Sequence, residues 1–275
     1  MSTPATKIAI TNRKGGVGKS TTAINLAGAL VMKKQRTLLL DLDTQGNATK
    51  GVGLQLTPEH RTIVDIFTGR ITDPHEAIAI AAWRDYTPFE LHVIPSHPEL
   101  SATEMGMIVQ SAIASYSSAM SERPNPLDSV KTVLEQLEGD YDFIIIDTAP
   151  DEGFLSKATL AAVELVVVPY ETGAFSDDGL YQAFMAVAET QKKSNPRLRV
   201  HGILPTKTEN TVFTRQEFDG ALKDYQQHVY PFDVPRRTWY NWSNKGGVPL
   251  VATASSDPAT SAYFKLAEML INERP

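Results

Sequence analysis

The sequence has no cysteine and no long apolar run. Its 275 residues include 42% hydrophobic residues, but none of the apolar stretches reaches the length of about 18 residues that a membrane-spanning helix needs. Residues 1–6 lack the basic start and the apolar core of a secretion signal. The absence of cysteine excludes every site that requires thiolate ligands. Together these absences predict a cytoplasmic globular protein.

The chain also lacks an overall excess of basic charge, since 32 Asp and Glu outnumber 26 Lys and Arg and give a net charge of −6. The sign reverses locally. Residues 192–250 hold ten Lys and Arg against five acidic residues, a segment charge of +5 that leaves −11 on the remainder. Such asymmetry is what a local phosphate-contacting surface would produce, and a set of solvated helix faces is the simpler alternative.

A glycine-rich turn lies between an expected strand at residues 5–11 and an expected helix at about 18–35. Its glycines leave backbone N–H groups free to converge on phosphate oxygens at the start of a helix, where anions are already favoured. Lys19 would then reach the terminal phosphates, and Ser20 would offer its hydroxyl to Mg²⁺. The residues of this turn are Lys14, Gly15, Gly16, Val17, Gly18, Lys19, Ser20 and Thr21.

Two further segments end in carboxylates. The apolar run 37–40 leads into Asp41 and Asp43, and the apolar run 143–146 leads into Asp147. Unbroken apolar runs of this length are typical of strands buried on both faces. Because ligands in open α/β sheets bind at the carboxyl ends of the strands, these carboxylates are expected beside the glycine-rich turn, although helix caps and turns also use such residues.

Strands and helices alternate through the rest of the chain. This order predicts an α/β fold, a mostly parallel twisted sheet with right-handed crossovers and helices on both faces, formed by residues 1–275 as a single domain. Further strands are expected at 91–95, 165–169 and 201–205, and helical patterns at 63–67, 74–82, 127–138 and 176–194.

The string from Lys14 to Thr21 resembles the deviant Walker A motif of the ParA/MinD ATPases, and the chain as a whole resembles a ParA. In place of the first glycine of an ordinary P-loop it has Arg13. In the family the extra lysine, here Lys14, crosses a dimer interface and touches the partner's nucleotide. The resemblance therefore implies a P-loop NTPase that hydrolyses ATP with Mg²⁺ and forms an ATP-dependent homodimer. Nitrogenase iron protein and iron–sulfur carrier ATPases share the loop but need cysteine, so they are excluded.

The resemblance also implies roles for individual residues. Asp43, in a segment similar to the family's DxDxQGN motif, would orient the attacking water, and Asp147 would hold Mg²⁺ through its water shell as in a Walker B motif. The implied catalytic residues are Lys14, Lys19 and Asp43, and the implied metal site is Ser20, Asp43 and Asp147. Pro235 and Arg237 stand where small ParA proteins carry the proline and asparagine of the adenine pocket, with Arg237 in place of the asparagine.

For DNA, the resemblance implies a contact by Arg236, and the basic segment adds Arg215 and Lys245 as candidates. The aromatic run 239–242 lies close by and could stack on a nucleotide or pack against the fold. With no N-terminal region for a helix-turn-helix, the small form of the family is expected, and it would bind DNA without sequence preference.

Three classes of function remain open. The first is a ParA-type ATPase that binds non-specific DNA in its ATP state, associates with the nucleoid, positions or segregates a cargo, and is released by a ParB-like activator or cargo adaptor. The second is a MinD-like membrane-positioning ATPase, which is disfavoured because residues 262–271 contain only Lys265 as a cation. The third is a metabolic enzyme or kinase of the wider fold.

Overall fold

The computed structural model describes residues 3–83, 88–116, 125–171, 176–209, 222–236, 247–253 and 257–274. The strands are β1 (Thr6–Ile10), β2 (Thr37–Leu42), β3 (Ala79–Ile80), β4 (His92–Ile94), β5 (Phe143–Thr148), β6 (Leu165–Tyr170), β7 (Arg199–Thr208) and β8 (Val234–Pro235). The helices are α1 (Lys19–Met32), α2 (Asn47–Gly51), α3 (Ile63–Phe67), α4 (Leu100–Tyr116), α5 (Ser129–Leu137), α6 (Phe154–Ala162), α7 (Ser176–Lys193), α10 (Leu250–Thr253) and α11 (Pro258–Glu273), with short 3₁₀ turns η1 (Pro74–Ala77), η3 (Pro126–Asp128) and η4 (Lys223–His228).

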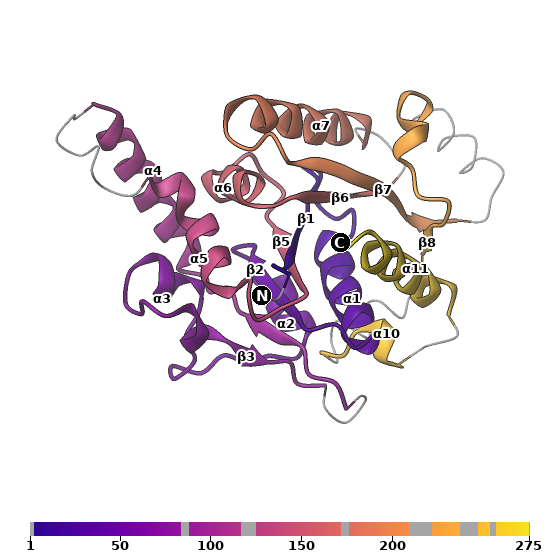
Figure 1. The fold of residues 1–275 in the computed structure, drawn as a ribbon, viewed down its shortest axis with the longest axis horizontal. Coiled ribbons are helices and arrows are strands. Elements are labelled where there is room, and N and C mark those ends of the chain that lie inside the picture. The colour runs from indigo at the N-terminus through magenta and orange to yellow at the C-terminus, as the bar shows by residue number, and fades with distance from the viewer. Residues whose placement is uncertain are drawn as a thin grey trace.

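The eight strands form one sheet in the order β3-β4-β2-β5-β1-β6-β7-β8 (Figure 1). All neighbouring pairs are parallel except β3 with β4 at one edge. The mostly parallel α/β sheet predicted from the sequence is therefore confirmed. Because β2, β5 and β1 are adjacent and parallel, the loops that follow them lie side by side at the carboxyl ends of these central strands.

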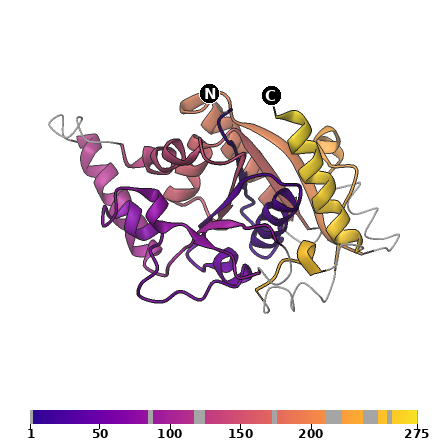
Figure 2. The same cartoon turned by 60° about the horizontal axis from the view of Figure 1, so that its bottom comes forward.

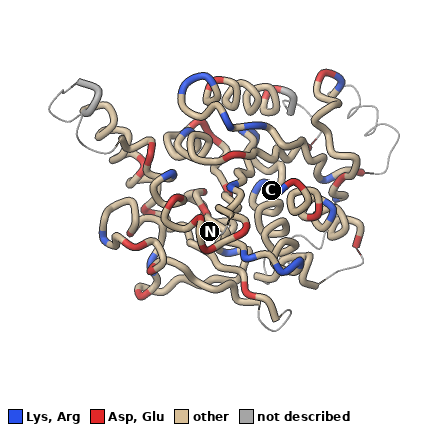
Figure 3. The backbone as a smooth tube through the Cα atoms, viewed as in Figure 1, with Lys and Arg blue, Asp and Glu red and all other residues tan. Residues whose placement is uncertain are grey.

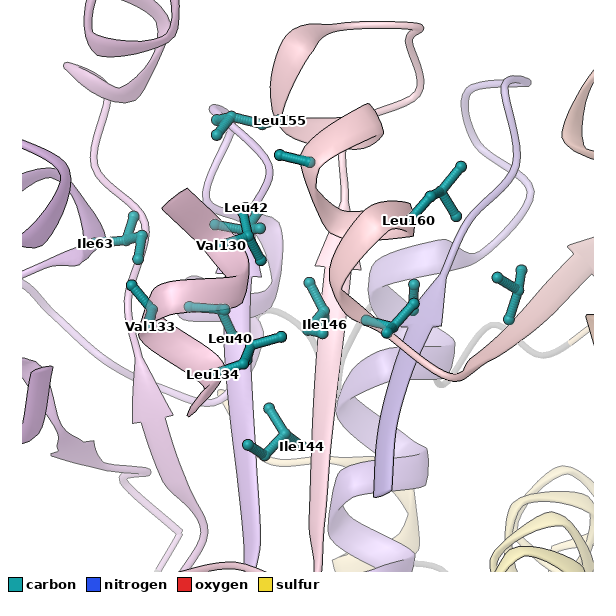
Figure 4. Packing of buried hydrophobic residues seen from close by; sticks show 14 of the residues in the cluster. Leu40, Leu42, Ile63, Val130, Val133, Leu134, Ile144, Ile146, Leu155 and Leu160 are labelled. Carbon is teal, nitrogen blue, oxygen red and sulfur yellow. The ribbon is translucent and has the colours of Figure 1, made fainter. Parts of the chain in front are cut away.

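The sheet is buried on both faces, which explains the unbroken apolar runs of its central strands. On one face, Leu40, Ile144 and Ile146 belong to a core that also includes residues of α5, α6 and α7. Figure 4 shows the part of this core under α5 and α6. On the opposite face, Leu39 and Ile145 belong to a core in which α1 lies against β2 and β5, and α10 and α11 pack on α1. Successive residues of a strand serve different cores because side chains alternate across the sheet, and each fully buried Leu or Ile stabilises the fold by about 1.5–3 kcal/mol.

Most predicted elements appear with boundaries shifted by a few residues, and one prediction is wrong. The helical pattern at 74–82 is only the 3₁₀ turn η1, which Asp73 caps by accepting a hydrogen bond from the backbone of His75, followed by the edge strand β3. Pro74 at the first position of the turn suits a helix start, but the chain extends again at Ile78. The short strand β8 was not predicted at all.

Helix α11 packs alongside α1, as both ribbon views show (Figure 2). Asp257 caps its N-terminus through a 2.8 Å hydrogen bond from the backbone N–H of Ala259. Its apolar residues Ala262, Leu266 and Leu270 are buried in the core on that side of the sheet. Among the helices that the structure describes, none combines the length and the apolar character needed to cross a membrane.

The end of α11 is tied to the sheet by Asp142, the residue before β5. Its carboxylate accepts hydrogen bonds from Arg274 at 2.6 Å and from the Arg36 guanidinium at 3.1 and 3.3 Å. Burial alone would raise the pKa of Asp142, but the bonds from the two arginines outweigh it and lower the pKa from 3.8 to about 2.

Replacing Asp142 with asparagine is expected to lower the free energy of unfolding at pH 7 by about 2 kcal/mol, because the ionised form is favoured in the folded state. Since the folded pKa lies below the unfolded one, this stabilisation is present above about pH 4 and disappears as the pH falls toward about 2. Denaturant unfolding of both proteins across this range measures the difference. A gap that stays constant with pH would contradict the assignment, and Glu59→Gln, at an exposed residue, is the control.

Candidate functional site

Loops from three adjacent central strands meet at the carboxyl ends of those strands. The loop after β1 leads into α1, β2 carries Asp41 and is followed by Asp43, and β5 carries Asp147. Asp41 and Asp147 are register partners in the β2–β5 pair. Lys19, the first residue of α1, interacts electrostatically with Asp147 and Asp43. The structure therefore brings the three sequence motifs to one place.

The loop between β1 and α1 takes its shape from glycines in left-handed conformations. Gly16 has a φ of 79° and Gly18 a φ of 92°, values that side-chain-bearing residues rarely adopt. Arg13, at the position of the usual first glycine, is not among the residues with positive φ, so glycine is not needed there. A Cβ added at Gly15 or Gly16 would meet nothing within 4 Å, which leaves the outside of the loop open for a ligand.

The N-terminus of α1 is open as well. Gly18 is its cap residue and supplies no side-chain hydrogen bond, and the first turn has no acidic residue. The N–H groups of that turn therefore point out of the helix without a carboxylate to satisfy them, which is the arrangement that binds phosphate groups. Ser20 and Thr21 lie in this turn and are both partly buried.

Side chains from neighbouring elements hold the loop in place. Asn12 accepts a hydrogen bond from the backbone N–H of Lys14 at 2.9 Å and donates to the carbonyl of Pro169 at 2.8 Å. The guanidinium of Arg13 binds Glu152 and, at 2.6 Å, Gln182 of α7. These contacts join the loop to β6 and to α7.

Lys19 is buried, with 6% of its surface exposed. Its ammonium group donates to the carbonyl oxygen of Lys14 at 3.1 Å, across the loop. Burial lowers the pKa of Lys19, and the negative charges of Asp147, Asp43 and Asp151 oppose that effect. A buried ammonium group in a loop of this shape gains from an anionic ligand, because the ligand would supply the charge partner that the loop carbonyl cannot.

Asp147 is fully buried, and neither of its carboxylate oxygens has a hydrogen-bond partner in the part of the chain that the structure describes. Burial raises the pKa of Asp147 well above its usual range, repulsion from Asp41 raises it further, and the nearby Ser20 side chain lowers it. A buried carboxylate without a partner is costly. A hydrated cation between Asp147 and the hydroxyl of Ser20 would remove this cost, so these residues fit a magnesium ion.

No group of three His, Cys, Asp or Glu side chains in the described ranges converges as a closed metal site. Mg²⁺ usually keeps several waters and is bound through one or two protein ligands together with phosphate oxygens. The metal that fits here would therefore depend on a phosphate ligand in the same site.

A network that the sequence did not predict holds the loop of Asp43. Asp41 accepts hydrogen bonds from the backbone and the hydroxyl of Thr49, both at 2.7 Å. Ser96 donates its backbone N–H to the Thr49 hydroxyl at 3.0 Å and its own hydroxyl to the carbonyl of Asp43 at 2.7 Å. Burial raises the pKa of Asp41 to about 6 against these bonds.

The carboxylate of Asp43 itself accepts a hydrogen bond from the backbone N–H of Gln45 at 2.9 Å, and the residue is 5% exposed. This bond fixes the turn that carries residues 45–47 away from β2. Asp41 and Ser96 thus act as supports, and Asp43 is one of the carboxylates whose charge acts on Lys19.

The end of β7 also supports the glycine-rich loop, which was likewise not predicted. The hydroxyl of Thr206 is bonded to the carbonyl of Val17 at 2.8 Å and to that of Tyr170 at 3.1 Å. The next residue, Lys207, donates hydrogen bonds from its ammonium group to the carbonyl of Gly16 and to the carboxylate of Glu171. No local motif marks these residues, because their partners lie far away in the sequence.

The residues expected to contact the base and DNA are only partly placed. Pro235 lies on β8 and Arg236 directly follows it, where its guanidinium pairs with Glu171 and Glu209, both at 3.1 Å. Arg215, Arg237, Lys245 and the aromatic run 239–242 lie outside the described residues.

Within the described ranges, the basic segment 192–250 does not form one surface. Its first part lies at the end of α7 and the start of β7 (Figure 3). Lys207 and Arg236 lie at the other end of the strands, near the glycine-rich loop. Acidic residues from outside the segment offset part of the charge, since Lys193 pairs with Glu189 and Arg199 with Glu273. The local charge of +5 therefore overstates any single positive surface.

The chain matches one family model and several known proteins over most of its length. The model of a family described as an AAA domain matches residues 5–200. The sporulation initiation inhibitor protein Soj of Bacillus subtilis is 31% identical over 95% of this chain and 96% of its own length. The chromosome partitioning protein ParA of Caulobacter vibrioides is 30% identical over 98% of this chain and 95% of its own.

Solved structures share the fold. A cobyrinic acid a,c-diamide synthase from Mycobacterium smegmatis, with a bound ATP analogue and magnesium, superposes with a TM-score of 0.78 over 98% of this chain and 95% of that one, at 24% identity. The cell division ATPase MinD of Pyrococcus furiosus has a TM-score of 0.75 over 98% and 99% of the two chains, at 17% identity. At these identities the likeness concerns the fold alone.

Proposed function

Since the chain belongs to the ParA/Soj family of ATPases, we propose that it is an ATP-dependent dimerising ATPase that binds non-specific DNA in its ATP state. Hydrolysis, stimulated by a ParB-like activator or a cargo adaptor, would release it. The observation that carries the nucleotide part is the partnerless buried carboxylate of Asp147 beside Ser20, at the open N-terminus of α1.

In this proposal the loop from Lys14 to Thr21 binds the phosphates through its backbone N–H groups. Lys19 turns from the carbonyl of Lys14 to the terminal phosphates, a short movement because it already lies across the loop. Ser20 and Asp147 hold the magnesium ion, with Asp43 close to it. Magnesium, when bound, neutralises charge that develops on the phosphates during transfer.

Asp43 orients the attacking water. Its carboxylate can accept a proton from water and place the oxygen in line with the leaving group without a covalent step. The hydrogen bonds of Ser96 and Gln45 around it fix the backbone at this residue, and an error of about 1 Å in such a position can cost about a hundredfold in rate.

Lys14 would act on the nucleotide of a second copy of the chain. Triphosphate charge buried between two subunits requires cations from both sides, and a lysine so supplied makes dimerisation depend on ATP. Pro235 and Arg237 would border the adenine, where a guanidinium can stack on the base.

The DNA part rests on Arg236 and on the basic residues Arg215 and Lys245. Two copies in a dimer would add their phosphate contacts, which explains physically why DNA affinity should depend on ATP.

DNA binding is expected to be at least about tenfold tighter with ATP than with ADP and to weaken steeply as salt is raised. Retention of a random-sequence duplex, measured in both nucleotide states over a salt series, tests this. Arg236→Ala should lower the affinity and reduce the salt dependence by about one ion. The control Lys131→Ala removes an exposed cation of α5 and should change neither. Equal retention with ATP and ADP would remove the switch from the proposal.

Membrane attachment is the alternative function, and a separate experiment should test it beside the DNA measurement. Helix α11 has its apolar face packed against α1, so it could bind a membrane only by leaving the core. Sedimentation with liposomes in the ATP state measures this directly, and binding to liposomes in place of DNA would favour the MinD-like function. Turnover of a small acceptor in place of water would favour a metabolic enzyme.

A further inference from the structure

A cluster of four charged side chains links the phosphate-binding loop to Arg236. Lys207, at the end of β7, donates its ammonium group to the carbonyl of Gly16 and to Glu171 at 2.9 Å. Glu171 also accepts a hydrogen bond from Arg236 at 3.1 Å, and Arg236 pairs in turn with Glu209 at 3.1 Å. These residues follow or end β6, β7 and β8, which are neighbours in the sheet.

Glu171 is the central member of this cluster. Its side chain is 19% exposed, and each of its two carboxylate oxygens is bound to a different cation. Lys207 adopts a left-handed φ of 53°, which is uncommon for a residue with a side chain and directs it toward both Gly16 and Glu171. The cluster is therefore held from both ends, by the loop and by β8.

Both cations lie where an external anion is expected. Lys207 is bound to the loop that would hold the nucleotide phosphates, and Arg236 is one of the residues expected to contact DNA. A carboxylate that already occupies both cations competes with those phosphates for them. Its charge also repels a triphosphate nearby, since partly buried charges are screened less than exposed ones.

We propose that Glu171 is an internal competitor for phosphate, which lowers the affinity of this chain for the nucleotide through Lys207 and for DNA through Arg236. The inference rests on the proposed function, because it takes the nucleotide to bind at the loop and DNA at Arg236. It adds a residue that sets both affinities, where the family resemblance implied none.

The matched variants are Glu171→Gln and Glu209→Gln, which remove one negative charge each and keep the size of the side chain. Glu171 touches both cations, whereas Glu209 touches Arg236. Glu171→Gln is expected to tighten binding of a non-hydrolysed ATP analogue with Mg²⁺ and binding of a random-sequence duplex, each on the order of 3- to 10-fold. Glu209→Gln should tighten DNA binding alone.

A second set of variants separates competition from a merely structural role. Adding Lys207→Met to Glu171→Gln should cancel the gain in nucleotide affinity, and adding Arg236→Met should cancel the gain in DNA affinity. Calorimetric titration and fluorescence anisotropy measure the two affinities, and the unfolding midpoint shows that each variant is folded. A structural role alone would shift the midpoint and leave both affinities unchanged or weaker.

The nucleotide measurement decides the inference without any DNA. Unchanged or weaker nucleotide binding in Glu171→Gln would overturn it, even if DNA binding responds to ATP as proposed. If the unaltered protein binds no DNA in any nucleotide state, the proposed function is wrong in that part. A gain in nucleotide affinity that depends on Lys207 would still support the competitor role of Glu171.

Discussion

Replacing Lys14 with alanine is expected to lower the rate of ATP hydrolysis by about 10³-fold and to abolish ATP-dependent pairing of two Lys14→Ala chains. The size follows from comparable cations supplied across an interface, which stabilise the charge of a phosphoryl-transfer transition state by a factor of about 10³ or more. A single chain should still bind ATP, because Lys19, the loop N–H groups and the Ser20–Asp147 pair remain.

Light scattering with ATP and with ADP measures pairing, and release of phosphate measures turnover. Lys131→Ala, on the exposed side of α5, controls for the loss of any lysine. If Lys14→Ala pairs and hydrolyses ATP as the unaltered protein does, the extra lysine has no role between chains and the dimer proposal fails.

The central part of the fold could be predicted because its signals are local. Residues 38–40 before Asp41 and 143–146 before Asp147 are all apolar, which predicts strands buried on both faces, and parallel pairing then brings their ends together. The conformation of Gly16 and Gly18 follows from the same kind of argument, since turns of this shape need residues that tolerate a positive φ.

The supports of the site could not be predicted in this way. Thr206 and Lys207 reach loop carbonyls about 190 residues earlier in the chain, and Ser96 reaches the carbonyl of Asp43. A threonine, a lysine and a serine at strand ends and turns are common residues whose partners are decided only when the strands assemble. The edge strand β8 also could not be predicted, because two residues are too few to show a strand pattern.

The net charge of residues 192–250 did not predict a single positive surface, for a related reason. Counting residues 192–250 as one unit ignored that β7 runs through the sheet parallel to β6, so that Arg199 lies at one end of the strands and Lys207 at the other. It also ignored partners from other elements, such as Glu171 and Glu273. A segment charge describes a surface only where the segment stays on one side of the fold.

Replacing Asp43 with alanine is expected to lower hydrolysis by about 10²- to 10³-fold while ATP binding and pairing persist. The side chain also accepts a hydrogen bond from Gln45, so alanine removes a structural contact as well. Asp43→Asn keeps an oxygen for that bond but cannot take a proton from water, and it should lose as much hydrolysis as alanine does. Recovery of most of the activity by Asp43→Asn would show that the hydrogen bond, and not the orientation of water, is what matters.

Mixing the two hydrolysis-deficient variants tests their roles together. In a dimer of one Lys14→Ala chain and one Asp43→Ala chain, the site on the first chain has its own Asp43 and receives Lys14 from the second. That site should hydrolyse ATP, so two inactive proteins that are mixed in equal amounts before ATP is added should become active. If Lys14 instead acts on the nucleotide of its own chain, neither site is complete and the mixture stays inactive. The same Asp43→Ala dimer, held in its ATP state, is also the form in which an activator or cargo adaptor should be captured, because it does not release itself by hydrolysis.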